Sequence, residues 1–281
     1  MMMCGNNSLG IKYTIISSSI QGASHKLTKA PNQDNYKIVE SSNAVIIAVA
    51  DGHGSSTCLH SKKGSAIAVR VFTKILADLI SEYEDIDSLK PFLLNKDDKL
   101  VAQTVEKEWK RRVIRSYRRF TKNTSGSRYN KEDKKNIWMQ YGTTLLGLVM
   151  TSSFIYTFQL GDGDIVISDD LGAKRIIESD GLLGTDTYSL SGIDACKCSK
   201  TVVLPLPDTN SDYSIMLVTD GFANSYNNDN IFLDTVSDYH NAIKEHGAEI
   251  INANLKSWLK ETSAGGSGDD ITMVIVYIKN N

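Results

Sequence analysis

Apolar runs with the character of β-strands alternate with polar, glycine-containing segments along this chain. Six runs have the length of strands and are rich in Val, Ile, Thr and aromatic residues: 44–50, 143–150, 154–160, 165–168, 214–219 and 271–278. Residues 151–153 join the second run to the third, and residues 161–164 join the third to the fourth. Because such short connections suit hairpins, the pattern predicts consecutive antiparallel strands.

Two longer segments carry apolar residues at helical spacing. These residues share one face in each segment: Ala68, Phe72, Ile75 and Leu79 in the first, and Val101, Val105, Trp109, Val113, Tyr117 and Phe120 in the second. A third helix is predicted around residues 242–259, whereas segments 82–99 and 121–137 are polar and loop-like. Antiparallel sheets with helices on their outer faces give an α+β fold, and without repeats or linkers we expect one domain over residues 1–281.

The composition limits the expected partners and location. The chain has 31 Lys and Arg residues against 33 Asp and Glu residues, so its charge balance favours neither nucleic acid nor an anionic membrane as a partner. Its apolar runs are far shorter than the roughly 20 residues of a membrane helix, and the start MMMCGNNSLG lacks the pattern of a signal peptide. With only four irregularly spaced cysteines, we expect a soluble, cytoplasmic and monomeric protein.

Two local features of the sequence differ from its average composition. Basic residues lie on the side of the second helix away from its apolar stripe, as a solvated face or a docking surface for an acidic partner: Arg111, Arg115, Arg118 and Lys122. Cys196 and Cys198 resemble half of a zinc site, but no second pair follows them, so zinc is not expected.

Acidic residues recur where the strand runs begin or end. Asp51 follows the run 44–50 and starts the sequence DGHG, and Asp220 follows the run 214–219. Asp269 and Asp270 precede the last run, and Asp34 closes the sequence PNQD. A single Asp-Gly pair is ordinary turn chemistry, but the repetition at strand ends favours a shared site.

Carboxylates gathered at one sheet edge repel one another unless a cation neutralises them. Oxygen ligands are preferred by hard ions such as Mg²⁺ and Mn²⁺, and a neighbouring glycine lets a backbone carbonyl approach as a further ligand. The acids at the strand ends therefore predict a divalent-metal site.

Six short motifs occur in a fixed order between positions 32 and 272: Asn32-Gln33-Asp34, VIIAVADGHG ending at Gly54, Gly142-Thr143-Thr144, Gly161-Asp162, LVTDG ending at Gly221, and GDDIT starting at Gly268. Together they resemble the type 2C metal-dependent Ser/Thr phosphatases. The resemblance implies a four-layer α-β-β-α sandwich of two antiparallel sheets flanked by helix pairs. It also implies hydrolysis of phosphoserine or phosphothreonine on proteins, by a water held between two Mn²⁺ or Mg²⁺ ions.

Matched position by position, the resemblance implies a set of metal ligands: Asp51 bridging both ions, the Gly52 carbonyl and Asp34 completing their shells, Asp220 and Asp269 on the first ion, and Asp162 on a weaker third ion. His53, next to Asp51, is placed to give the leaving alkoxide its proton. The implied partner is a phosphorylated protein, together with a cognate Ser/Thr kinase.

Several positions depart from the commonest pattern of that family. Lys29 stands where many relatives hold the substrate phosphate with arginine, and His25 is a second candidate for this contact. Gln33 replaces a glutamate of some relatives, and Asn224 replaces an acid linked to the third ion. Asp270 replaces a frequent asparagine, where it either orients the preceding metal acid or, as we expect, caps the turn.

Two other functions fit the same residues. One is a catalytically silent phosphatase-fold scaffold that binds a partner, which Lys29, Asn224 and the basic helix face would suit. The other is a two-metal hydrolase of small phosphoesters or nucleotides, whose chemistry would be the same. Metal binding separates the first alternative from an active phosphatase.

Overall fold

The computed structural model describes residues 2–6, 9–94, 99–124, 134–178, 187–207 and 211–280. Its strands form two sheets, in the orders β1-β2-β11-β10-β7-β8 and β3-β4-β5-β6-β9, and all their pairings are antiparallel. The first sheet contains β1 (Met2–Asn6), β2 (Lys12–Ile20), β7 (Asp164–Asp169), β8 (Gly172–Arg175), β10 (Tyr213–Val218) and β11 (Ile271–Lys279). The second contains β3 (Asn35–Glu40), β4 (Val45–Ala50), β5 (Leu145–Met150), β6 (Phe154–Leu160) and β9 (Lys200–Pro205).

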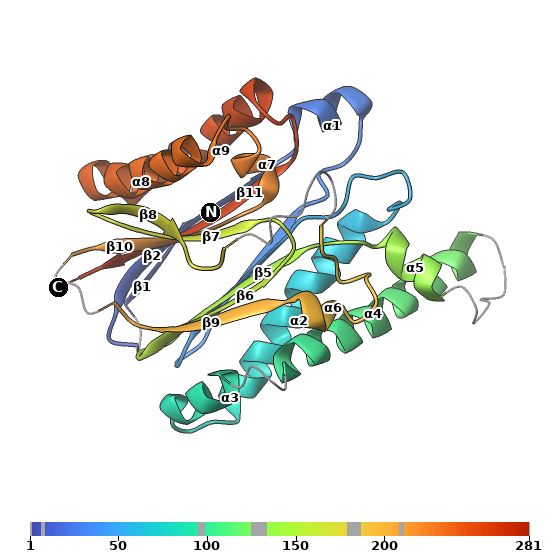
Figure 1. Cartoon of the computed structure of the whole chain (residues 1–281), viewed down its shortest axis with the longest axis horizontal. Coiled ribbons are helices and arrows are strands. Elements are labelled where there is room, and N and C mark those ends of the chain that lie inside the picture. Colours follow the sequence, from blue (N-terminus) through green and yellow to red (C-terminus); the bar gives the residue numbers. More distant parts are fainter. Residues whose placement is uncertain are drawn as a thin grey trace.

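Helices cover the outer face of each sheet (Figure 1). The second sheet is covered by α2 (Ser61–Ser81) and α4 (Leu100–Thr124), and the first by α8 (Asp229–His246) and α9 (Ala248–Gly265). Shorter helices complete the described chain: α1 (Ala23–Thr28), η1 (Ile86–Leu89), α3 (Lys90–Leu94), α5 (Lys134–Gln140), α6 (Ala195–Cys198) and α7 (Asp220–Ala223). The predicted four-layer α-β-β-α sandwich is therefore confirmed.

Three hydrophobic clusters fill the spaces between the four layers, and β4 shows how one strand serves two of them. Successive side chains of a strand point to opposite faces. Ile46 and Ala48 pack with α2 and α4, whereas Ile47 and Val49 pack between the two sheets. The third cluster joins the first sheet to α8 and α9. Because both faces of β4 are buried, its sequence is a continuous apolar run without alternation.

The connection from β6 to β7 differs from the predicted hairpin. The β5–β6 hairpin is present, with Met150 opposite Ile155. Beyond it, β6 pairs with β9, whereas β7 pairs with β10 in the other sheet. The chain therefore crosses between sheets at residues 161–164. Gly161 has a φ of 106°, and a Cβ on Gly163 would lie 2.8 Å from the Val218 carbonyl oxygen, so glycine permits this sharp crossing.

The predicted helix at 242–259 is wrong in its bounds, because it merges parts of two helices. α8 ends at His246 and α9 starts at Ala248. Between them Gly247 adopts a φ of 87° and donates its N–H to the Ile243 carbonyl, which is a common way to end a helix. A short interruption of this kind leaves the apolar periodicity on both sides intact.

The segments predicted as loop-like are partly helical. Segment 82–99 contains η1 and α3, and segment 121–137 contains the end of α4 and the start of α5. Leu89 and Leu93 are buried in the first segment, so a few apolar anchors order an otherwise polar stretch. Residues 95–98 and 125–133 lie outside the described part of the chain. No described helix is both long and apolar enough to cross a bilayer.

Candidate metal centre

The two sheets present their acid-bearing strand ends at a common edge. The start of β3 lies beside the end of β4, with Asn35 opposite Ala50, and the end of β10 lies beside the start of β11. The predicted acids flank these ends and the β6–β7 crossing: Asp34, Asp51, Asp162, Asp220 and Asp269. The Thr219 hydroxyl donates to Asp34 Oδ2 at 2.9 Å, which joins the two sheets at this edge.

The backbone of Asp51 is fixed by the two threonines of the Gly-Thr-Thr motif. Its N–H donates to the Thr144 hydroxyl at 3.1 Å, and its carbonyl accepts the Thr144 N–H at 2.9 Å and the Thr143 hydroxyl at 2.5 Å. A Cβ on the next residue, Gly52, would lie 2.7 Å from the Gln33 carbonyl oxygen, so this close approach requires glycine. These contacts hold Asp51 without using its carboxylate.

Asp34 is buried, with 5% of its surface exposed. Its N–H donates to the Asn32 side chain at 2.9 Å, and Oδ2 accepts the Thr219 hydroxyl. Oδ1 is buried and has no hydrogen-bond donor among the described residues. Since an unsatisfied buried carboxylate oxygen is costly, this atom suits coordination to a cation.

Asp51, Asp162 and Asp220 each bring a carboxylate oxygen within 4.8 Å of the others. The Asn224 amide donates to Asp220 Oδ2 at 2.9 Å, so this replacement for an acid orients a neighbouring carboxylate. Three convergent carboxylates supply the all-oxygen donor set that hard divalent ions prefer. The residues of this edge therefore fit Mn²⁺ or Mg²⁺.

The pKa values of the clustered acids are raised, which indicates that too little positive charge lies near them to stabilise their ionised forms. Burial, followed by the charge of Asp34, raises the pKa of Asp51 well above its usual range. Burial and then the charge of Asp51 raise the pKa of Asp220 in the same way. The pKa of Asp34 is raised to about 8 by burial and then by the charge of Asp270. A bound cation would favour the ionised forms of all three groups.

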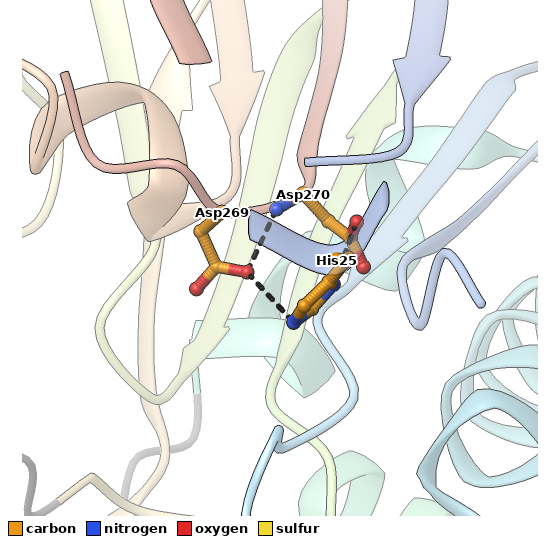
Figure 2. A group of neighbouring side chains, drawn as sticks. All are labelled: His25, Asp269 and Asp270. Atoms are coloured by element: carbon orange, nitrogen blue, oxygen red, sulfur yellow. Dashed lines mark hydrogen bonds and ion pairs between the residues drawn. The ribbon is translucent and has the colours of Figure 1, made fainter. Parts of the chain in front are cut away.

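Figure 2 shows a second group of side chains, His25, Asp269 and Asp270, and the charge of Asp269 acts on both Asp51 and Asp220. Nδ1 of His25, on α1, lies 2.9 Å from Asp270 Oδ1, and Nε2 lies 3.7 Å from Asp269 Oδ1. The Asp270 carboxylate accepts the N–H groups of Gly22 and Gln33, each at 2.7 Å, and its own N–H donates to Asp269 Oδ1 at 2.7 Å. The Asp270 side chain thus ties the start of α1 and the Asp34 loop to β11, which corrects the expectation that it caps its own turn, while only its backbone N–H contacts Asp269.

His53 lies next to the acids, where the sequence places it. The backbone N–H of His53 donates to the Gly142 carbonyl at 3.2 Å. A Cβ on Gly142 would lie 2.6 Å from the Cδ2 atom of the His53 ring. The ring therefore packs directly on Gly142. Burial lowers the pKa of His53, while the charge of Asp162 acts in the opposite direction.

The two candidate phosphate contacts differ in their surroundings. Lys29 is exposed at the C-cap of α1, has a φ of 60°, and forms no ion pair with a described acid. His25 lies against two carboxylates, as Figure 2 shows. Phosphate binding by Lys29 and His25 stays a prediction.

Gln33, which replaces a glutamate of some relatives, donates from its side-chain amide to the Ser61 hydroxyl at 2.6 Å.

Residues that hold the acids in place were not anticipated from the sequence. Thr219 links the sheets because its hydroxyl donates to Asp34, and the same hydroxyl accepts the Thr272 N–H at 2.9 Å within the β10–β11 pair. Thr143 and Thr144 support Asp51 from another loop. These threonines lie within the Gly-Thr-Thr, LVTDG and GDDIT motifs, but the motifs alone do not say which groups their hydroxyls contact.

Comparison with known proteins places this geometry in a family. The family model described as "Protein phosphatase 2C" matches residues 21–260. The serine/threonine phosphatase of S. agalactiae is 15% identical, with a TM-score of 0.58 over 94% of this chain and 99% of that one. The catalytic domain of the serine threonine protein phosphatase PstP, solved with two manganese ions, is 15% identical, with a TM-score of 0.55 over 95% and 99% of the two chains. At these identities the structures show the fold.

One curated protein also matches part of the chain. The pH-response regulator protein palI/RIM9 of Debaryomyces hansenii is 32% identical over 103 residues. The match spans 36% of this chain and 26% of that protein. Because it covers about a third of the chain, it does not bear on the sandwich as a whole.

Proposed function

Because the chain belongs to the protein phosphatase 2C family, we propose that it is a metal-dependent phosphatase that hydrolyses phosphoserine and phosphothreonine on proteins. The observation that carries the proposal is the convergence of Asp51, Asp162 and Asp220 within 4.8 Å, next to the buried and unsatisfied Asp34 Oδ1. Burial and then the neighbouring carboxylates raise the pKa values of Asp51 and Asp220, and such a cluster favours a catalytic site over a scaffold without catalysis.

The residues that would hold two Mn²⁺ or Mg²⁺ ions are the Gly52 carbonyl and the acids of the sheet edge: Asp34, Asp51, Asp220 and Asp269, with Asp162 for a third ion. When bound, such ions supply an activated water and stabilise the charge on the phosphoryl oxygens. The chain itself contributes rigidity, since Thr143, Thr144 and Thr219 lock the backbone and side chains that carry these ligands. Pre-positioned ligands lower the cost of reorganisation during the reaction.

His53 would hold the proton that the departing serine or threonine oxygen needs. Its ring packs on Gly142, and its position two residues after Asp51 would bring it close to a phosphate bound at the carboxylate cluster. A histidine whose pKa is lowered by burial gives up its proton readily once it is protonated. Lys29 and His25 would approach the phosphate from α1.

Hydrolysis of a phosphothreonine peptide tests this function. Purified protein should release phosphate with Mn²⁺ and stop with EDTA, whereas Asp220→Asn, which keeps the shape but removes the charge, should lose activity. Asp234→Asn, an exposed position on α8, is the matched control and should retain full activity. Metal-independent hydrolysis, or an active Asp220→Asn variant, would rule the proposal out.

The physiological setting is part of the same proposal. We propose a phosphorylated protein as substrate and a cognate Ser/Thr kinase as its counterpart, with the enzyme acting as a cytoplasmic monomer. Calorimetry with Mn²⁺ separates the enzyme, which needs at least two sites, from a silent scaffold. A preference for small esters over phosphothreonine peptides would instead favour the small phosphoester hydrolase.

A further inference from the structure

A strongly basic surface lies on the outer helical layer, over α4. It is defined here as the α4 basic surface by six exposed side chains: Lys107, Arg111, Arg115, Arg118, Arg119 and Lys122. A hollow of about 680 Å³ lies on its α5 side, and eight of the ten residues that line this hollow are Lys or Arg. A second hollow of about 500 Å³ lies on the α2 side, with five basic residues among eight.

The two hollows form one continuous surface. Arg115 and Arg119 line both of them, on the ridge that separates the α2 side of α4 from the α5 side. Neither hollow has an Asp or Glu in its described lining. In a protein with a formal charge of -2, this is a pronounced local excess of positive charge.

Little of this charge is neutralised by the helix itself. The acids of α4 are Glu106, which pairs with Lys110 at 2.5 Å, and Glu108, which pairs with Arg111 and Arg112. No acid follows Glu108 in α4. Arg115, Arg119 and Lys122 form no ion pair with any described residue. Like charges at helical spacing are destabilising, so an anionic partner would relieve their repulsion.

The surface also contains apolar side chains, and each of its two aromatic rings has a cation over one face. Ile114 and Trp138 lie in the first hollow, and Phe120 lies in the second. Lys110 Nζ lies 4.7 Å from the centre of the Trp138 ring, and Lys63 Nζ lies 5.1 Å from that of Phe120. Single-stranded nucleic acid needs open aromatic faces on which bases can stack. The arrangement therefore fits an acidic protein segment with interspersed apolar side chains better than it fits nucleic acid.

The chain runs within four residues from Trp138, in the first hollow, to Gly142 at the His53 ring. α5 ends at Gln140, whose carbonyl accepts the His60 N–H at 2.7 Å, and the chain then reaches Gly142 beneath the His53 ring. We propose that the α4 basic surface docks an acidic segment of the protein substrate while the phosphorylated residue lies at the carboxylate cluster. The identification of the partner as a substrate rests on the proposed phosphatase function.

Peptide binding tests the surface without using the metal centre. The probe is a fluorescein-labelled peptide of Glu-Ser-Leu repeats, measured by fluorescence anisotropy in EDTA against its Gln-Ser-Leu counterpart. The Glu peptide should bind more tightly, and Arg115→Gln/Arg119→Gln should weaken its binding about tenfold, as expected for loss of charge-assisted contacts. The control Lys256→Gln/Lys260→Gln removes the same charge from exposed positions of α9 and should change the affinity less than about twofold.

Three results would overturn the inference: equal binding of the Glu and Gln peptides, equal losses in the two double variants, or tighter binding of a single-stranded DNA oligonucleotide than of the Glu peptide. Hydrolysis of p-nitrophenyl phosphate, which needs the metal centre alone, separates this inference from the phosphatase proposal. The arginine double variant should hydrolyse it at the unmodified rate. If no variant hydrolyses it, the phosphatase proposal fails, whereas the peptide measurements still decide whether the surface binds acidic segments.

A kinetic comparison then tests the role in substrate selection. A phosphothreonine peptide with a Glu-Ser-Leu tail should show a KM about tenfold higher with Arg115→Gln/Arg119→Gln than with the unmodified enzyme, at unchanged kcat. The same peptide without the tail should not distinguish the two. An equal effect on both peptides would exclude docking of the acidic segment.

Discussion

At the sheet edge, Asp34, Asp51 and Asp220 reach one site from loops far apart in the sequence, whereas the cations of the α4 basic surface follow one another along a single helix. The acids are largely withdrawn from water, so their repulsion raises their pKa values. The cations are exposed, and water and salt screen them from one another. A buried cluster of carboxyl groups ionises only against mutual repulsion, which a proton or a bound cation would relieve, whereas an exposed cluster of cations stays charged in water.

The largest expected effect is a loss of activity at the metal centre that leaves peptide binding by the α4 basic surface unchanged. Asp51→Asn removes the charge of a proposed metal ligand, while the Thr143 and Thr144 contacts to its backbone remain. We expect kcat on a phosphothreonine peptide to fall by at least about a thousandfold. Anisotropy with the Glu-Ser-Leu peptide should show unchanged binding. If binding falls with activity, the two regions are not independent.

The next largest expected effect is a change with pH in the free energy of unfolding of the metal-free protein. The Asp34 carboxyl keeps its proton up to about pH 8 in the folded state, but loses it near pH 4 when unfolded. The folded state then binds more protons between these values, so its stability falls as pH rises through this window. From pH 6 to pH 8, Asp34 alone should lower the free energy of unfolding by about 2 kcal/mol.

Urea unfolding in EDTA at the two pH values measures this change. Mn²⁺ should remove most of the loss, because it favours the ionised carboxylates. Asp34→Asn, which does not titrate, should lack the Asp34 contribution. A metal-free protein that is equally stable at both pH values, with or without the substitution, would contradict the raised pKa.

A smaller effect is expected from the support of Asp51. Thr144→Val preserves the side-chain shape but leaves the Asp51 N–H without its acceptor. An unsatisfied buried donor should lower the free energy of unfolding by roughly 1 to 2 kcal/mol. Chemical denaturation measures the loss, and calorimetry should show weaker Mn²⁺ binding. Thr144→Ser retains the hydroxyl and serves as the control; equal Mn²⁺ affinity in both variants would remove Thr144 from the support of the metal centre.

The smallest expected effect is a change in peptide binding by the α4 basic surface. Glu108→Gln releases Arg111 and Arg112 from their ion pairs and adds one positive charge to the net charge of α4. Affinity for the Glu-Ser-Leu peptide should rise about twofold, with a steeper dependence on salt. Hydrolysis of p-nitrophenyl phosphate should not change. A decrease in peptide affinity would show that Glu108 positions the arginines for binding.

Local patterns were sufficient for much of the fold. The β5–β6 hairpin follows from its three-residue connection, and β4 was recognisable as an apolar run that ends in Asp51. The basic face of α4 follows from helical spacing alone. By contrast, the length of the 161–164 connection does not say in which sheet the next strand pairs, so the crossing between sheets was missed. Gly247 was missed for a similar reason, since the apolar periodicity continues across it.

The sequence alone is enough to single out the candidate residues for the chemistry: acids at strand ends beside glycines, and a run of cations on one helix. How the acids are held follows only from the folded chain, where Asp270 reaches Gly22 and Gln33, and Thr219 reaches Asp34. These partners are far apart along the chain, and their contacts arise from strand register and sheet packing. No spacing rule within one segment contains that information.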